Sequence, residues 1–179
     1  ISGQTAGFRG YIKTGLYSKI TAEYHHLEEF RRGGDNLNLP PHEVMIAEQT
    51  KHGINTGGLK FDWFSKDQRH RFNAFASIQH INRESYYGAG MDPNAYGMTT
   101  DLTWVGGAQY VHKFKKAFFM PADLTAGVEY NEDYLRDNMW GYDRVTDQTV
   151  RIVSAYAQNE WKNARWGILI GGRLDKHNL

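Results

Sequence analysis

The chain contains no cysteine. This absence excludes disulfide scaffolds, thiol nucleophiles and cysteine-ligated zinc sites, and leaves oxidising and reducing compartments equally open. Long hydrophobic runs are also missing: no stretch approaches the roughly 18 apolar residues of a membrane helix, so a helical membrane protein is excluded. Charge is balanced, with 21 Lys and Arg against 20 Asp and Glu, a formal net charge of +1. That balance gives no reason to expect nucleic acid as a partner, because such proteins normally present a basic surface.

Glycine and aromatic residues, in contrast, are plentiful. The 179 residues include 19 Gly, and aromatics make up 14% of the chain, which argues against low-complexity disorder. A mean hydropathy of −0.65 fits a soluble protein but also a membrane barrel, whose strands alternate apolar and polar side chains. The chain opens Ile1-Ser2-Gly3-Gln4 without an initiator Met or an apolar signal region. We therefore expect a mature protein or an excised segment.

Apolar and polar side chains alternate with a period of two through most of the chain. Leu102, Trp104 and Tyr110, for example, share one predicted face, whereas Thr103 and Gln109 share the other. Strands are predicted within 7–13, 16–30, 59–63, 72–78, 99–114, 124–130, 148–162 and 166–174. Segments such as 99–114 span about 14 to 16 residues, against about 5 or 6 in soluble sheets. The prediction is an all-β antiparallel meander of about eight long strands.

The breaks between these strands are of two alternating kinds. Residues 65–68, 115–121 and 162–165 are short turns, whereas 31–44, 83–99 and 137–147 are long and rich in Gly, Asn, Asp, Pro and Tyr. Alternate connections of a meander lie at opposite ends of the sheet, so the short turns are expected at one end and the long loops at the other. This asymmetry is typical of outer-membrane barrels. Aromatics flank the short turns, where an interfacial girdle is expected: Trp63, Phe64, Phe114, Trp161 and Trp166. The meander is therefore predicted to form part of a transmembrane β-barrel.

The alternation also predicts which way the faces point. The even-numbered positions of 102–114, 124–130 and 166–174 are expected to face lipid. Gln109, Glu129 and Asp175 are then expected to face a wet lumen.

Five short motifs occur in order along the chain: Arg31-Arg32-Gly33-Gly34-Asp35-Asn36, Glu48-Gln49-Thr50, Tyr86-Tyr87-Gly88, Ala157-Gln158-Asn159-Glu160-Trp161-Lys162 and Gly171-Gly172-Arg173-Leu174-Asp175-Lys176-His177. Together they resemble the barrel of TonB-dependent outer-membrane receptors of the Bacteroidetes type. The resemblance implies a 22-stranded barrel with a plugged lumen in the bacterial outer membrane. It also implies TonB-driven uptake of a scarce ligand such as an iron chelate (siderophore), a cobalamin or a glycan.

The chain departs from the full family pattern in three ways. It has no plug domain and no recognisable TonB box, so TonB is expected to act only through parts absent from this chain. It also ends at Asn178-Leu179, within a predicted strand and without a terminal aromatic. We therefore expect residues 1–179 to be a middle segment, about a third of a receptor barrel. Two alternatives stay open: a complete eight-stranded barrel with a structural or adhesive role, and a soluble β domain with its apolar faces inward.

The long connections hold the candidate ligand-binding residues, because flat aromatic rings with polar tips suit a macrocycle, a chelate or a sugar, and arginines suit an anion. These candidates are Arg83, Tyr86, Tyr87, Met91, Tyr96, Trp140, Tyr142 and Arg144. The competing interpretations are lipid-headgroup contacts, especially for Tyr86 and Tyr87, and surface ion pairs for the two arginines. The expected partners are outer-membrane lipid and a small-molecule or glycan ligand.

Other motifs predict no chemistry. His25 and His26 are adjacent, and neighbouring strand residues point to opposite faces, so they cannot chelate a metal together. Gly88-Ala89-Gly90 lacks the following helix of a dinucleotide loop. The acidic cluster of Asn131, Glu132, Asp133 and Asp137 lacks EF-hand spacing and is interpreted as a solvated rim at the end of a strand. We expect no catalytic residues, no metal and no cofactor.

Overall fold

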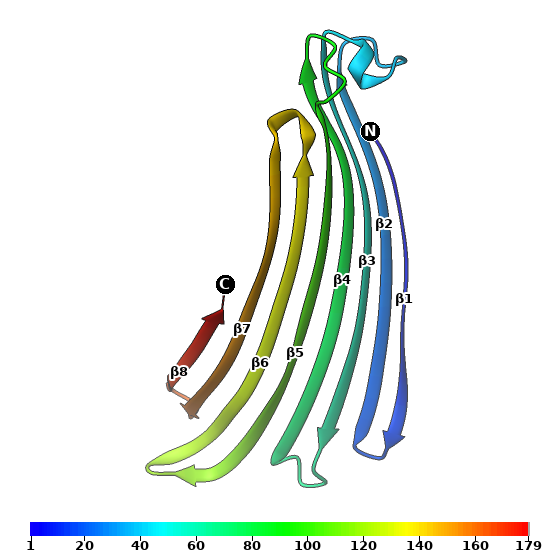
Figure 1. Ribbon diagram of the computed structural model, residues 1–179. Coiled ribbons are helices and arrows are strands. Elements are labelled where there is room, and N and C mark those ends of the chain that lie inside the picture. The colour runs from blue at the N-terminus through cyan, green and yellow to red at the C-terminus, as the bar shows by residue number, and fades with distance from the viewer. Residues whose placement is uncertain (179) are drawn as a thin grey trace.

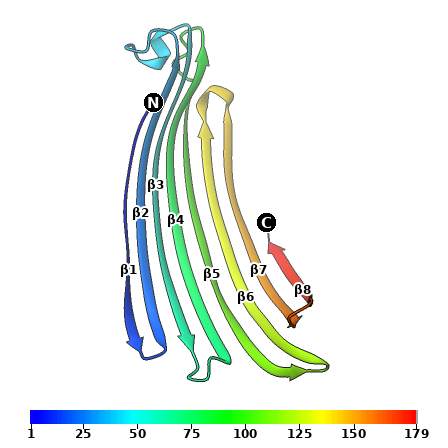
Figure 2. The same cartoon turned by 180° about the vertical axis from the view of Figure 1, so that it is seen from behind.

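A computed structural model describes residues 1–178 as one antiparallel sheet of eight strands in the order β1-β2-β3-β4-β5-β6-β7-β8 (Figures 1 and 2). The strands are β1 (Ser2–Gly15), β2 (Ser18–Gly34), β3 (Ile46–Phe64), β4 (His70–Ala89), β5 (Tyr96–Ala117), β6 (Met120–Met139), β7 (Arg144–Lys162) and β8 (Gly167–Asn178). Two three-residue 3₁₀ helices, η1 (Pro41–Glu43) and η2 (Trp140–Tyr142), lie between strands. Within residues 1–178 no helix is long and apolar enough to cross a membrane. The predicted all-β meander is confirmed.

The connections lie alternately at the two ends of the sheet (Figure 1). At the loop end 35–45 and 90–95 are longer than the turns at the other end, as predicted, whereas 140–143 is no longer than the turn 163–166. The loops are shorter than expected, however, because β2 continues to Gly34, β4 continues to Ala89 and β7 begins at Arg144. Polar residues line both faces of these strand ends, so the apolar alternation that marks a strand disappears. The backbone still pairs across neighbouring strands, since each N–H and C=O needs a hydrogen-bond partner.

The register places the predicted apolar positions on one face. Ala108 pairs with Val128, Val128 with Ala155, and Ala155 with Leu174. We call this the outward face. Its large side chains are uncovered; Trp104 is 48% and Leu174 80% exposed. No other part of residues 1–178 packs over this face.

Aromatic residues bound the outward apolar face at both ends. Tyr24, Trp104 and Tyr130 lie toward the loops, and Trp63, Tyr110, Phe114 and Trp161 lie toward the short turns. Ten residue steps separate Trp104 from Phe114 along β5. At about 3.3 Å per step and a strand tilt of about 40°, the apolar band is roughly 25 Å tall, which matches a barrel's lipid-facing band.

One predicted girdle residue lies elsewhere. Phe64 follows Trp63 directly and therefore points to the opposite face, where the Arg71 guanidinium lies 5.1 Å from its ring centre. The expectation that both aromatics join one girdle was wrong for Phe64. The aromatic group by the last turns is denser than expected, because Phe119 stacks on both Trp161 and Trp166.

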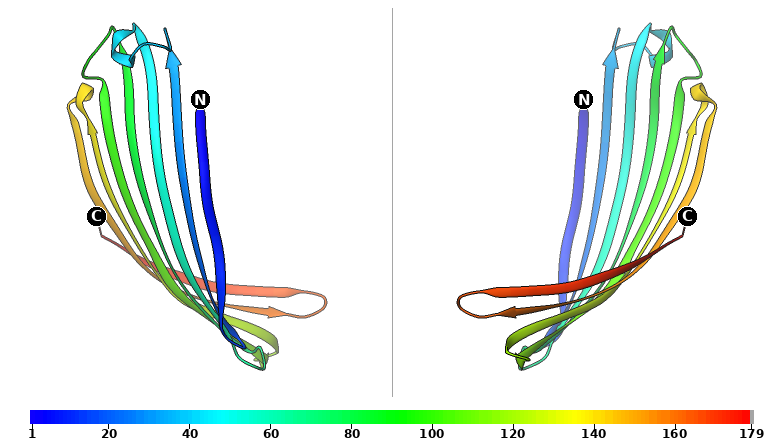
Figure 3. Two further views of the ribbon diagram at one scale, coloured as in Figure 1. Left: turned by 90° about the vertical axis from the view of Figure 1, so that its right-hand side faces the viewer. Right: turned by 90° about the vertical axis from the view of Figure 1, so that its left-hand side faces the viewer.

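Polar side chains form a network on the other face, which we call the inward face. The Tyr156 hydroxyl donates to Gln109 Oε1 at 2.8 Å, and Arg173 Nη1 donates to Glu129 at 2.6 Å. Arg173 Nε also donates to Asp175 at 2.8 Å. The first two bonds join strands two apart, as expected where side chains converge on the concave side of the curved sheet (Figure 3). Gln109, Glu129 and Asp175 therefore share one polar face, as the alternation predicted.

The sheet is open. Within residues 1–178, β1 pairs only with β2 and β8 pairs only with β7, so the two edge strands do not meet. Figure 3 shows the resulting curved trough. A complete eight-stranded barrel would pair β8 with β1, so the structure does not match that alternative.

A candidate ligand-binding site near the loops

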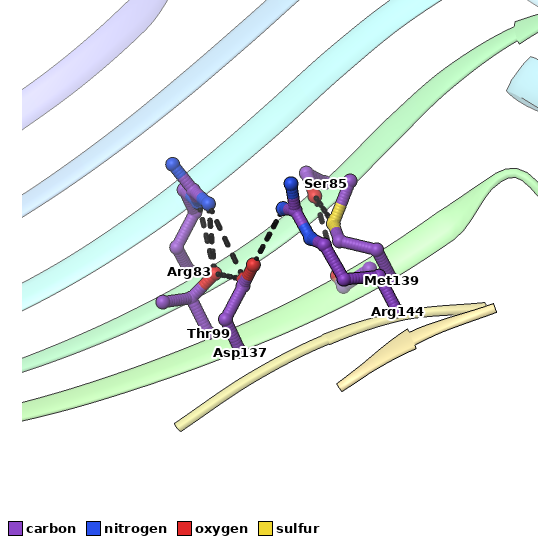
Figure 4. A network of polar contacts seen from close by, with 7 residues as sticks. Arg83, Ser85, Thr99, Asp137, Met139 and Arg144 are labelled. Atoms are coloured by element: carbon purple, nitrogen blue, oxygen red, sulfur yellow. Dashed lines mark hydrogen bonds and ion pairs between the residues drawn. The ribbon is translucent and has the colours of Figure 1, made fainter. Parts of the chain in front are cut away.

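A charged cluster crosses three neighbouring strands on the inward face, toward the loop end. Arg83 of β4 is the register partner of Thr99 of β5, and Thr99 is the partner of Asp137 of β6. The Thr99 hydroxyl accepts hydrogen bonds from Arg83 Nη2 at 2.8 Å and Nε at 3.2 Å, and donates to Asp137 Oδ1. Arg144 Nη2 donates to Asp137 Oδ2 at 2.8 Å. Figure 4 shows Arg83 and Arg144 on either side of the Asp137 carboxylate.

Asp137 holds the two arginines in place. It is only 6% exposed, and Arg83 Nη2 lies 3.6 Å from its Oδ1 in addition to the Arg144 contact. A buried carboxylate needs such partners, because an unpaired charge is costly to remove from water. Two guanidinium groups around one carboxylate leave one net positive charge. The Arg144 side chain is 59% exposed and keeps donor groups that can reach an anionic ligand.

The wall beside this cluster is tightly packed. The Ser85 hydroxyl donates to the Gly97 carbonyl at 3.4 Å and lies 3.9 Å from the Met139 sulfur (Figure 4). A Cβ added to Gly97 would overlap that sulfur and lie 2.9 Å from Ser85 Oγ. A side chain at position 97 would therefore displace the Met139 and Ser85 side chains next to Arg83.

Tyr86 and Tyr96 pack inside the loops. Tyr86 is 0% exposed and forms a small core with Val44, Ala47 and Ala95. Its hydroxyl donates to the Asp92 carbonyl at 2.9 Å, and its ring meets Tyr96 edge-on at 4.9 Å. The prediction that Tyr86 offers an open surface to a ligand or to lipid does not match this burial. Tyr86 anchors the loop, because burying its ring among the apolar side chains of this small core is more favourable than exposing the ring to water.

Tyr96 is fixed by a further contact, since its hydroxyl lies 2.6 Å from His42 Nδ1. Tyr87 shares the inward face with Arg83, two alternating positions away on β4. Met91, Trp140 and Tyr142 lie in the loops and are exposed. The structure thus brings Arg83 and Arg144 together, places Tyr87 on the same face, and separates Tyr86 and Tyr96 from them.

The acidic cluster differs from its predicted form. Asn131, Asp133 and Asp137 point inward, whereas Glu132 points outward and accepts a hydrogen bond from Arg151 Nε at 2.8 Å. β6 continues to Met139, so these residues do not mark a strand end, and Asp137 is buried instead of solvated. Sequence reasoning missed the roles of Asp137 and Thr99, because only the register of three strands brings them to Arg83.

These features define a barrel-like antiparallel sheet with an apolar outward face, a polar inward face and a cationic cluster near its loops. Among solved structures, the siderophore receptor PirA from Pseudomonas aeruginosa is similar, with a TM-score of 0.59 and 11% sequence identity over 98% of this chain. At that identity the likeness shows the fold alone. The match covers 34% of the receptor chain, so this chain spans about a third of its length. No protein-family model and no curated protein matches the chain.

Proposed function

We propose that this chain is part of an outer-membrane receptor barrel that takes up a scarce ligand such as an iron chelate, a cobalamin or a glycan. The observation that carries the proposal is the outward apolar band between two aromatic rows, in a sheet that matches a third of a siderophore receptor. Energy coupling through TonB would use parts outside these residues. Outer-membrane lipid is the partner of the outward face, and the ligand is the partner of the inward face and the loops.

The ligand is expected to meet Arg144, Tyr87 and the exposed loop residues Met91, Trp140 and Tyr142. Arg83 would contribute through the same cluster. The net positive charge around Asp137 favours a ligand with a carboxylate, phosphate or catecholate group. The proposed role of this cluster is binding: the Thr99 hydroxyl, which donates to Asp137, accepts two hydrogen bonds from Arg83, so both of its lone pairs are occupied.

Localisation and binding of the full-length protein test this proposal. Cell fractionation should place it in the outer membrane, and extraction should need detergent. Ferric siderophores, cobalamin and oligosaccharides should then be titrated into the purified barrel. A protein recovered in soluble fractions, or one that binds none of these ligands, would contradict the proposed function.

Arg144→Gln tests the site itself, because it removes an exposed donor and leaves the Arg83 contact to Asp137 intact. A charge-assisted hydrogen bond contributes about 1.5–3 kcal/mol, so an anionic ligand should bind at least tenfold more weakly. Arg151→Gln is the matched control, since Arg151 forms an equivalent ion pair on the outward face. Equal ligand affinities of the two variants would show that Arg144 does not contact the ligand.

A further inference from the structure

Two neighbouring short turns, one after β5 and one after β7, carry an aromatic cluster at the edge of the outward face. The Phe119 ring stacks on Trp161 and Trp166, with ring centres 5.8 and 6.5 Å away, and Phe118 lies 6.4 Å from Trp161. Trp161 Nε1 donates to the Ala117 carbonyl at 3.0 Å, which fixes this ring of β7 to the end of β5. We call the four aromatic residues the turn cluster.

Most of the turn cluster is uncovered. Phe118 is 89%, Phe119 55% and Trp166 50% exposed. Phe118 also has a φ of 61°, in the left-handed region that favours glycine. An aromatic ring at such a position contributes little to packing within residues 1–178. Contiguous exposed apolar side chains of this kind mark a surface that contacts a partner.

Cationic side chains surround the turn cluster without acidic neighbours in the sequence. Residues 111–120 and 161–166, which hold the two turns, contain five Lys or Arg and no Asp or Glu. Two of the five lie within 4.0 Å of an acidic side chain elsewhere in the sheet. The other three, Lys115, Lys116 and Arg165, are exposed and form no ion pair within residues 1–178. These three positive charges can therefore attract an anionic partner.

The level of these cations along the strand indicates the kind of anion. Lys115 and Lys116 directly follow Phe114, which lies in the aromatic row that bounds the apolar band. At about 3.3 Å per residue, they lie roughly 3–7 Å beyond that row. If lipid covers the outward face, this is the level of the lipid headgroups, where tryptophan rings and cations are both favourable.

We propose that the turn cluster, with Lys115, Lys116 and Arg165, binds the headgroup of an anionic phospholipid such as phosphatidylglycerol. This inference rests on the proposed membrane location and adds a headgroup preference to it. The aromatic rings lie against the glycerol and the first acyl carbons, and the cations contact the phosphate oxygens. Phosphatidylcholine is less favourable, because its own ammonium group neutralises the phosphate and repels the same cations.

Native mass spectrometry of the complete protein, released from detergent micelles, measures the dissociation constants of single phospholipids. Phosphatidylglycerol and phosphatidylcholine with the same acyl chains are the probes. One cation beside an anionic lipid contributes roughly fivefold to the affinity. Lys115→Gln combined with Arg165→Gln should therefore weaken phosphatidylglycerol binding by at least about fivefold and phosphatidylcholine binding by less than about twofold.

Lys51→Gln combined with Arg136→Gln is the matched control. Both cations are exposed on the outward face toward the loops, so the control removes the same two charges from the other end of the sheet. Their register partners are acidic, Glu84 for Lys51 and Asp147 for Arg136, so their attraction for an anionic lipid is weaker. The control should change both affinities by less than about twofold.

Reconstitution into phosphatidylcholine vesicles separates a failure of this proposal from a failure of the proposed function. A barrel that inserts into these vesicles but binds the two lipids equally would keep its membrane location and lose the headgroup site. An unchanged phosphatidylglycerol affinity of the Lys115→Gln, Arg165→Gln variant would also overturn the site. A protein that inserts into vesicles of neither lipid would overturn both proposals.

Discussion

A charge placed on the outward face distinguishes lipid from water most clearly. Ala157 on β7 is exposed and lies between Val153 and Trp161, near the middle of the apolar band. If water covered this face, Ala157→Arg would be an ordinary surface change, within about 0.5 kcal/mol of neutral. If lipid covers it, the arginine lies near the bilayer midplane and costs about 2–4 kcal/mol.

That cost lowers the folding equilibrium constant by roughly 30- to 700-fold. The assay is urea unfolding of the complete barrel in lipid vesicles. Thr149→Arg is the matched control on the same strand and face, because Thr149 pairs with the outward aromatic Tyr134 and lies at the loop-side edge of the band, where an arginine costs about 0–1 kcal/mol. Ala157→Arg should be at least about 1 kcal/mol less stable than Thr149→Arg. Equal stability of the two variants would refute the lipid-facing assignment.

Three further substitutions test the remaining structure. Asp137→Ala should cost about 1–3 kcal/mol in the same urea assay, because it removes the acceptor of Thr99 and of the partly exposed Arg83 and Arg144; a cost below about 0.5 kcal/mol would contradict the cluster. Gly97→Val should destabilise the barrel and weaken ligand binding together, since its side chain overlaps a neighbour, and an unchanged variant would contradict the tight wall. The Ser65 hydroxyl donates to Asp67 and lowers the pKa of that carboxyl below its ordinary value of 3.8. This stabilisation is present above the unfolded pKa and is lost as pH falls through the folded one, so Asp67→Asn should destabilise the protein at pH 7 and have less effect near pH 3.

The part of the fold that the sequence predicts is the part between the two aromatic rows. There one face is apolar and the other polar, so alternation identifies both the strand and its orientation, as for Trp104 against Gln109 on β5. Beyond the rows apolar residues are fewer and irregularly spaced, and the alternation disappears. The sequence therefore predicts loops at the ends of β2, β4 and β7, although their backbones pair regularly.

The candidate site was predictable in composition but not in geometry. Arg83 and Arg144 are arginines in polar segments, which makes them candidates for contacting an anion, and the structure does bring them together. The carboxylate between them is recognisable only from the register of β4, β5 and β6, which joins residues far apart in sequence. Tyr86 failed as an exposed contact for a similar reason, because its burial depends on Val44 and Ala95 from two other segments.

The central claim is that the outward face contacts lipid and the inward face contacts water. Because this segment has no cysteine, a single introduced cysteine can be labelled specifically within it to test that claim. Ala108 and Gln109 are adjacent on β5 and point to opposite faces. Spin labels are attached at Ala108→Cys and Gln109→Cys in the complete barrel reconstituted in lipid. Different paramagnetic agents should accelerate the relaxation of the two labels. The account predicts that apolar oxygen reaches the label at 108 and a water-soluble nickel chelate reaches the label at 109. Nickel access to position 108 equal to that at 109 would contradict it.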